Sequence, residues 1–147
     1  MGKKPGEYED ALIWVENLIE RAGGNFKVTL TGHSLGGGLA TYAALHNNKP
    51  AVVFNAAPMG AGMLSDIKNL DKQPLISNID VQGDPVSALG GQIGTKYILE
   101  IPATMMGQLG FVNNQNMLAG PSFATDELAL YHSIDTIVKV LQSLVKQ

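Results

Sequence analysis

Apolar and polar positions recur with two different periods along the chain, and these periods predict helices and strands in turn. Residues 7–22 carry an apolar stripe at a spacing of three and four, followed by two glycines, which predicts an amphipathic helix that ends there. The short segment 26–31 is rich in β-branched side chains, which predicts a strand. Residues 35–47 return to a helical composition. A strand therefore gives way to a helix within about three residues.

The same alternation continues towards the C-terminus. We expect strands at residues 51–55, 75–81 and 95–101, and helices at residues 62–70 and 128–145. Strands that alternate with helices are typical of a parallel sheet covered on both faces, so the sequence predicts an α/β fold with a mainly parallel sheet of about four strands flanked by helices. No repeat, low-complexity tract or linker divides the chain, which we expect to form a single domain over residues 1–147.

Composition narrows the range of functions. With 147 residues, 45% of them hydrophobic, the chain is within the usual range for one globular domain with its own core. Ten Lys and Arg against thirteen Asp and Glu give a net charge of -3 without a basic block, so nucleic acid is not an expected partner. The absence of cysteine excludes disulfides, zinc-thiolate sites and thiol nucleophiles. Neither an export signal nor an apolar run of about 20 residues occurs, so we expect a soluble chain without stable membrane insertion; its compartment stays open.

The stretch VTLTGHSLGGGLA, residues 28–40, places one serine between the predicted strand and helix. In a strand–Gly-x-Ser-x-Gly–helix arrangement, a nucleophile elbow, the serine occupies a strained turn, and we expect Gly32 and Gly36 to let strand and helix pass without collision. The turn lifts the Ser34 hydroxyl above the sheet edge. The following helix points its N-terminus at the same place, so the backbone N–H of Leu35 can stabilise an oxyanion.

A nucleophilic serine needs a base, and the base needs an orienting carboxylate. The chain has three histidines. His33 is a variable position inside the turn and His46 lies near the end of the next helix, so we expect His132, just inside the closing helix, to be the base. Asp84 directly follows a predicted strand and is the expected acid, while Asp80, its nearest competitor, lies within the strand. The resulting order Ser, Asp, His is the order that the α/β-hydrolase fold requires.

Residues 31–40, TGHSLGGGLA, resemble the serine turn of the class 3 lipases, the fungal-type triacylglycerol lipases. The similarity extends through residues 52–58, VVFNAAP, through residues 83–86, GDPV, and to His132. The resemblance implies an α/β-hydrolase-like fold of which this chain is the C-terminal catalytic portion. Members of that family have further strands ahead of this point, one of which is followed by a loop that supplies a second oxyanion donor. We therefore expect the N-terminal part of the full fold to be missing and the chain to be truncated.

A strand edge left bare in this way would expose unpaired backbone groups. We expect it to be met by a second copy of the chain in a homo-oligomer or by a missing N-terminal partner segment. The resemblance further implies serine esterase chemistry on carboxylic esters, often acylglycerols or phospholipid acyl chains, with neither cofactor nor metal.

One long irregular segment, residues 102–125, is rich in apolar side chains. Flexible thioethers suit varied alkyl shapes, so this segment is a candidate acyl pocket, and packing over an open sheet face is an equal alternative. The expected substrate-binding residues are Met105, Met106, Leu109, Phe111 and Met117.

The sequence thus predicts a serine carboxylic-ester hydrolase, a lipase or esterase of lipid metabolism, that acts on a small-molecule or lipid ester through an acyl-enzyme. Two alternatives stay open. The same three residues would serve an acyltransferase or a thioesterase. A chain with a single oxyanion donor would also suit a non-catalytic or partner-dependent interaction module.

Overall fold

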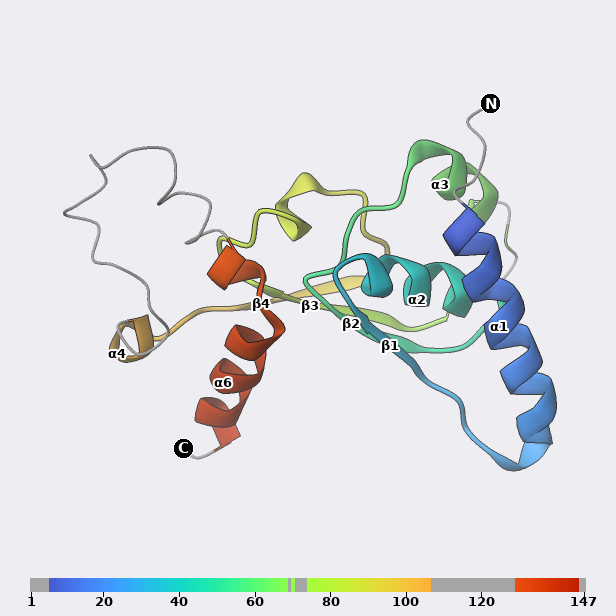
Figure 1. The fold of residues 1–147 in the computed structure, drawn as a ribbon, viewed down its shortest axis with the longest axis horizontal. Coiled ribbons are helices and arrows are strands. Elements are labelled where there is room, and N and C mark those ends of the chain that lie inside the picture. Colours follow the sequence, from blue (N-terminus) through green and yellow to red (C-terminus); the bar gives the residue numbers. More distant parts are fainter. Residues whose placement is uncertain (1–5, 69, 71–73, 107–128, 146–147) are drawn as a thin grey trace.

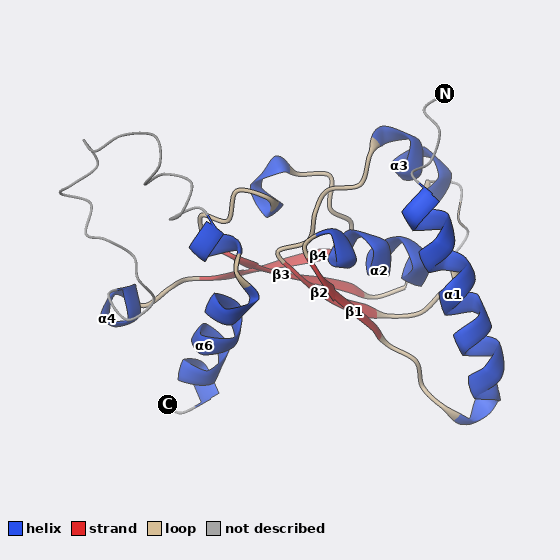
Figure 2. Cartoon of the chain, in the orientation of Figure 1, coloured by secondary structure: helices blue, strands red, loops and turns tan. Residues whose placement is uncertain are grey.

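Four parallel strands form one sheet in the order β1-β2-β3-β4 (Figures 1 and 2). The computed structural model describes residues 6–68, 70, 74–106 and 129–145. The strands are β1 (Leu30–His33), β2 (Ala51–Phe54), β3 (Ile76–Val81) and β4 (Thr95–Leu99). The expected α/β-hydrolase-like fold with a four-stranded parallel sheet is confirmed.

Helices lie around the sheet and beyond its end (Figure 1). They are α1 (Gly6–Ala22), α2 (Leu35–His46), α3 (Ala61–Ile67), α4 (Ala103–Met106) and α6 (Ile134–Val145), with short 3-10 turns η1 (Gly23–Asn25) and η2 (Ser87–Leu89). Helix α2 packs on β1 and β2, and α1 packs on α2, whereas α6 lies across the sheet from α2. The core lies beside α2, where Tyr42, Leu45 and Val53 are buried.

Strand β1 begins later than its composition predicts. The sequence places a strand at residues 26–31, but β1 begins at Leu30. The backbone N–H of Leu30 donates to the carbonyl of Pro50 at 3.0 Å. Proline has no N–H to continue the ladder in the other direction, so regular pairing with β2 begins here. At the other end the N–H of Ser34 donates to the carbonyl of Phe54 at 3.1 Å, which keeps the pairing in register up to the serine.

The closing helix is interrupted. A continuous helix is expected over residues 128–145, but within the described residues it is interrupted at Ser133: residues 129–132 are helical, and α6 begins at Ile134. The hydroxyl of Ser133 accepts a hydrogen bond from the backbone N–H of Asp135 at 3.2 Å, which caps the N-terminus of α6. His132 therefore lies in the turn that leads into α6, and its expected place inside the closing helix is wrong.

The two outer strands differ from the inner ones. Within the described residues, β1 pairs only with β2, and β4 pairs only with β3. Tyr97 and Ile98 are neighbours on β4 that point to opposite faces, and each is 52% exposed. In the described part of the chain, β4 is therefore less covered than the other strands of the sheet.

Candidate active site

Ser34 occupies the turn between β1 and α2 in a conformation that few residues adopt. Its backbone has φ 56° and ψ −126°, outside the regions that side chains favour. Four backbone hydrogen bonds hold it there: its N–H donates to Phe54, and its carbonyl accepts from Gly37 at 3.0 Å, from Gly38 at 3.2 Å and from Ala57 at 2.9 Å. The contacts fix the hydroxyl at the carboxyl end of the sheet.

Glycine is required on only one side of this turn. A Cβ at Gly32 would lie 2.1 Å from the carbonyl oxygen of Gly36 and 2.7 Å from the backbone nitrogen of Gly37, and neither backbone atom can move away. A Cβ at Gly36 would meet nothing within 4 Å. The expectation that Gly36 prevents a collision is therefore wrong, because the clearance between strand and helix comes from Gly32.

Asp84 is carried by a tight turn after β3. The turn is closed by the backbone N–H of Asp84, which donates to the carbonyl of Val81 at 3.0 Å. The residue is 1% exposed. Its Oδ2 accepts a hydrogen bond from the backbone N–H of Ser87 at 2.6 Å, and its Oδ1 lies 2.7 Å from Nδ1 of His132. Both carboxylate oxygens thus have a donor, as a buried charge requires.

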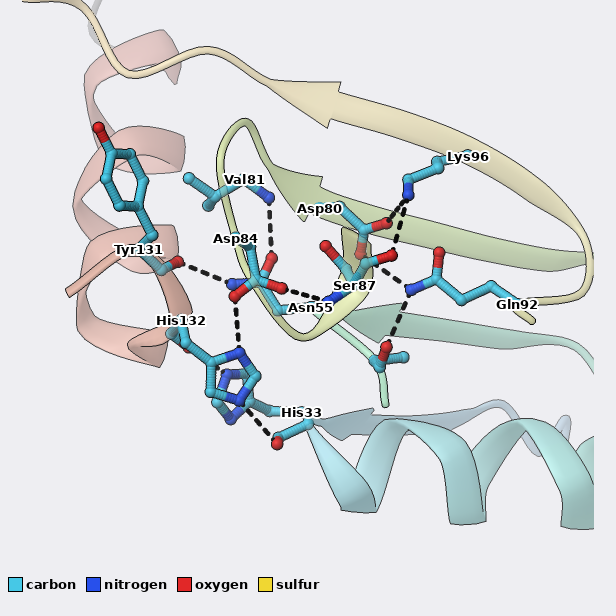
Figure 3. A network of polar contacts seen from close by, with 12 residues as sticks. His33, Asn55, Asp80, Val81, Asp84, Ser87, Gln92, Lys96, Tyr131 and His132 are labelled. Atoms are coloured by element: carbon cyan, nitrogen blue, oxygen red, sulfur yellow. Dashed lines mark hydrogen bonds and ion pairs between the residues drawn. The ribbon is translucent and has the colours of Figure 1, made fainter. Parts of the chain in front are cut away.

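His132 bridges the acid and the serine. Its Nδ1 lies 2.7 Å from Asp84 Oδ1, and its Nε2 lies 2.7 Å from Oγ of Ser34. A carboxylate only accepts hydrogen bonds, so Nδ1 carries the proton and Nε2 of a neutral imidazole accepts from the serine hydroxyl. Figure 3 shows the His132 ring in line with the Asp84 carboxylate. The structure brings together the three residues that the sequence proposes, and this tautomer is the one that a base requires.

Asp80, the competing acid, has other partners (Figure 3). Its fully buried carboxylate lies 3.1 Å from Nζ of Lys96 through Oδ2 and accepts from Nε2 of Gln92 at 3.4 Å through Oδ1. Lys96 also donates to the carbonyl of Ser87 at 3.4 Å, on the turn that carries Asp84. Asp80 is therefore part of a neighbouring ion pair, whereas Asp84 is the acid that contacts His132.

The expected oxyanion donor lies on an open surface. Leu35 is the first residue of α2, and it is 47% exposed. Gly36 beside it is exposed as well. The N-terminus of α2 therefore faces solvent next to the Ser34 hydroxyl, where a substrate carbonyl can approach.

Only part of the expected acyl-binding segment is described. Helix α4 carries Met105 and Met106, which are both partly buried. Leu109, Phe111 and Met117 lie outside the described residues. Their expected role stays a prediction.

The described residues offer neither a cluster of metal ligands nor a helix that could span a membrane. The described residues contain no group of three His, Asp or Glu side chains placed to hold a metal ion. None of the helices described is both long enough and apolar enough to cross a bilayer.

Two residues of the site were not found from the sequence. His33 lies with Nε2 2.7 Å from the carbonyl oxygen of His132, and the two rings are 4.8 Å apart. Asn55, fully buried with φ 41°, donates to the carbonyl of Tyr131 at 3.0 Å and accepts from the N–H of Val81 at 2.8 Å. The only local signal was a polar asparagine at the end of an otherwise apolar strand.

One comparison relates the chain to lipid-acting proteins. The sequence model described as "Phospholipase-like: Tle-like phospholipase domain" matches residues 1–128, which include Ser34 and Asp84 but not His132. A comparison with curated proteins finds no match. The match supports a lipase or phospholipase type of protein, although not the class 3 lipases specifically. The chain belongs to the family of Tle-like phospholipase domains, and its membership supports hydrolysis of lipid esters as its activity.

Proposed function

We propose that Ser34, His132 and Asp84 are the catalytic triad of a serine hydrolase that cleaves acyl esters of lipids. One observation carries the proposal. Two hydrogen bonds of 2.7 Å join three side chains that are 48 and 98 residues apart in the sequence. Membership of a phospholipase-like family makes an acyl ester the expected substrate class.

In the first half of the reaction, Oγ of Ser34 attacks the ester carbonyl carbon while its proton moves to Nε2 of His132. Asp84 holds the Nδ1 proton and stabilises the imidazolium that forms. The negative charge on the carbonyl oxygen faces the backbone N–H of Leu35 and the N-terminus of α2. The carbon–oxygen bond of the ester then breaks, His132 returns its proton to the departing alcohol, and an acyl-Ser34 ester is left.

In the second half, water repeats the attack. His132 takes one proton from the water as its oxygen bonds to the acyl carbon, and it returns this proton to Oγ of Ser34 as the acyl bond breaks. A carboxylic acid leaves and the enzyme is restored. If another alcohol or a thiol takes the place of water, or a thioester takes the place of the ester, the same residues perform acyl transfer or thioester cleavage.

The similarity around Ser34 also supports a relation between this family and the class 3 lipases. We infer from it that acylglycerols and phospholipids are the lipids to test first. Met105 and Met106 are the described candidates for contact with the acyl chain.

The direct test is labelling with a fluorophosphonate, followed by measurement of the intact mass. We expect one adduct on the wild type, none on Ser34→Ala, and the full adduct on Ser143→Ala, which removes a serine from α6. An unlabelled wild type, or labelling that persists in Ser34→Ala, would contradict the proposal. An unlabelled wild type would instead favour an interaction module.

Substrate class is then resolved by product analysis. Phosphatidylcholine, a triacylglycerol and nitrophenyl esters of increasing chain length are offered separately, and the released acid is measured. Competing alcohols and acyl thioesters test for acyl transfer and thioesterase activity. We expect free fatty acid to be the main product, with no release by Ser34→Ala.

A further inference from the structure

We propose that His33 and Asn55 are positioning residues that hold the backbone of Tyr131 and His132, and so place the His132 imidazole between Asp84 and Ser34. The inference rests on the proposed triad but concerns residues outside it. An imidazole that makes two short hydrogen bonds at once has little freedom of orientation. Catalytic groups must be held to within about 0.5 Å of their working geometry, which requires support from the surrounding residues.

Asn55 joins the acid turn to the histidine segment. Its Oδ1 accepts from the N–H of Val81, the last residue of β3, and its Nδ2 donates to the carbonyl of Tyr131. Val81 also accepts the hydrogen bond that closes the turn of Asp84. Figure 3 shows Asn55 between these two partners. A single buried amide therefore sets the spacing between the backbone of the acid and that of the base.

The position of Asn55 suits this task. It follows β2 directly, and its N–H donates to the carbonyl of Ile79 at 3.0 Å, which ties it to β3. Asparagine is among the few side-chain-bearing residues that readily accept a positive φ such as its 41°. An amide both donates and accepts, which the two unlike backbone partners require.

His33 holds the next carbonyl along the chain. Its Nε2 lies 2.7 Å from the carbonyl oxygen of His132, so Nε2 must carry a proton and donate. Its ring also faces the His132 ring at 4.8 Å with a tilt of 35°. Because His33 precedes Ser34, the chain segment that carries the nucleophile also supports the base.

Consecutive carbonyls are thus held from two strand ends, β1 and β2. A third contact adds to them: a Cβ at Gly83 would lie 3.3 Å from the Tyr131 ring, so this ring rests on the residue before Asp84. A misplacement of about 1 Å in a catalytic group can cost about 10²-fold in rate. We therefore expect loss of either hydrogen bond to lower kcat and leave KM nearly unchanged.

The His33 test uses two substitutions that separate the ring from the donor. His33→Phe keeps a ring against His132 but has no donor for its carbonyl. His33→Gln loses the ring but keeps an amide Nε2 that reaches a similar place. We expect His33→Phe to lower kcat and the rate of fluorophosphonate labelling by about 10²-fold, and His33→Gln to recover most of this loss.

The Asn55 test uses a matched buried asparagine. Asn55→Asp keeps the acceptor for Val81 but sets an oxygen against the carbonyl of Tyr131. Asn78→Asp makes the same change at a buried residue that donates to the carbonyl of Ile93 at 2.8 Å. We expect both variants to unfold more easily, but only Asn55→Asp to lose kcat. Asn55→Gly, which tolerates the positive φ and lacks the amide, should match Asn55→Asp in kcat.

A spectroscopic readout separates this inference from the proposed function. The proton between His132 Nδ1 and Asp84 is expected far downfield in the ¹H NMR spectrum of the wild type and weakened in His33→Phe, whether or not any ester is cleaved. If the fluorophosphonate does not label the wild type, but the downfield signal is present there and weakened in His33→Phe, the proposed function alone is overturned. If His33→Phe and the Asn55 variants were labelled as fast as the wild type and kept its NMR signal, the positioning role alone would be overturned. Equal losses in His33→Phe and His33→Gln would also overturn it.

Discussion

The two sides of Ser34 are built differently. On the side of proton transfer, Asp84 is 1% exposed and both its carboxylate oxygens are hydrogen-bonded. The backbone around His132 is held by two further side chains. On the side where the proposed mechanism places the ester carbonyl, Leu35 is 47% exposed and a Cβ at Gly36 would meet nothing within 4 Å.

This difference follows from what each side has to do. Proton transfer needs donor and acceptor atoms fixed in one arrangement, which buried hydrogen bonds provide. In the proposed mechanism the other side admits a lipid ester, and open space beside the first turn of α2 is compatible with that role. The described residues give that side one expected donor, the N–H of Leu35, so substitutions can perturb the two sides separately.

The largest effect is expected from the acid. Asp84→Asn leaves the shape of the side chain but removes the charge that holds the Nδ1 proton of His132. We expect kcat to fall by about 10⁴-fold, the usual result when the acid of a triad loses its charge. Asp80→Asn is the matched control, because it changes a buried carboxylate that pairs with Lys96. Ester hydrolysis measures both; if Asp80→Asn loses as much activity, the assignment of the acid is wrong.

The next largest effect is expected from the loss of the Leu35 N–H, on the side of Ser34 where the ester carbonyl is proposed to bind. Proline at the first residue of a helix is well accepted because the helix does not use that N–H. Leu35→Pro removes the expected oxyanion donor, and it also disfavours the backbone conformation of Ser34, because the residue before a proline is restricted to extended angles. We therefore expect kcat to fall by at least about 10²- to 10³-fold, the usual cost of the donor alone. Leu35→Ala keeps the N–H and should stay close to the wild type. Circular dichroism establishes that α2 has formed in both variants, and equal activity in the two would show that Leu35 is not the donor.

A smaller effect, on the stability of the fold, is expected from the glycines in the turn around Ser34. Gly32→Ala sets a Cβ against two backbone atoms, and we expect it to lower the free energy of unfolding by about 3 kcal/mol, at the upper end of ordinary overpacking. Gly36→Ala meets nothing and adds a better helix former, so it should be at least as stable as the wild type. Urea unfolding measures both. A stable Gly36→Ala without activity would indicate that the bound ester fills the space over Gly36.

What the sequence could predict is mostly local. The order of elements follows from hydrophobic periodicity, and the glycine-flanked serine and the Gly83–Asp84 turn place their side chains after strands β1 and β3. The parallel sheet follows from the alternation of strands and helices. These features depend on residues within a few positions of each other.

What the sequence could not predict depends on distant partners. The start of β1 depends on Pro50, which lies opposite Leu30 on the next strand. The roles of His33 and Asn55 depend on carbonyls that are 99 and 76 residues away. The open space at Gly36 is likewise a property of the folded chain, because the same Gly-x-Ser-x-Gly spacing makes both glycines look equally necessary.

The smallest effect is expected from Tyr8 on α1, the helix that packs on α2. A Cβ at Gly38 would lie 2.7 Å from the Tyr8 hydroxyl, so this buried phenol touches the helix that carries Leu35. Burial, and to a smaller extent the charge of Glu7, raises the pKa of Tyr8 above its ordinary value of 10.0. Above pH 10 the unfolded chain therefore loses this proton before the folded chain does.

The unfolded state then binds fewer protons, so the free energy of unfolding falls as the pH rises through this range. We expect Tyr8→Phe to make this fall shallower above pH 10, with ester hydrolysis at neutral pH unchanged because the proton-transfer side does not contact Tyr8. Tyr97→Phe, at a half-exposed ring on β4, is the matched control. Urea unfolding at neutral pH and above pH 10 gives the comparison. An unchanged slope in Tyr8→Phe would mean that this phenol does not couple α1 to the stability of the helix beside Ser34.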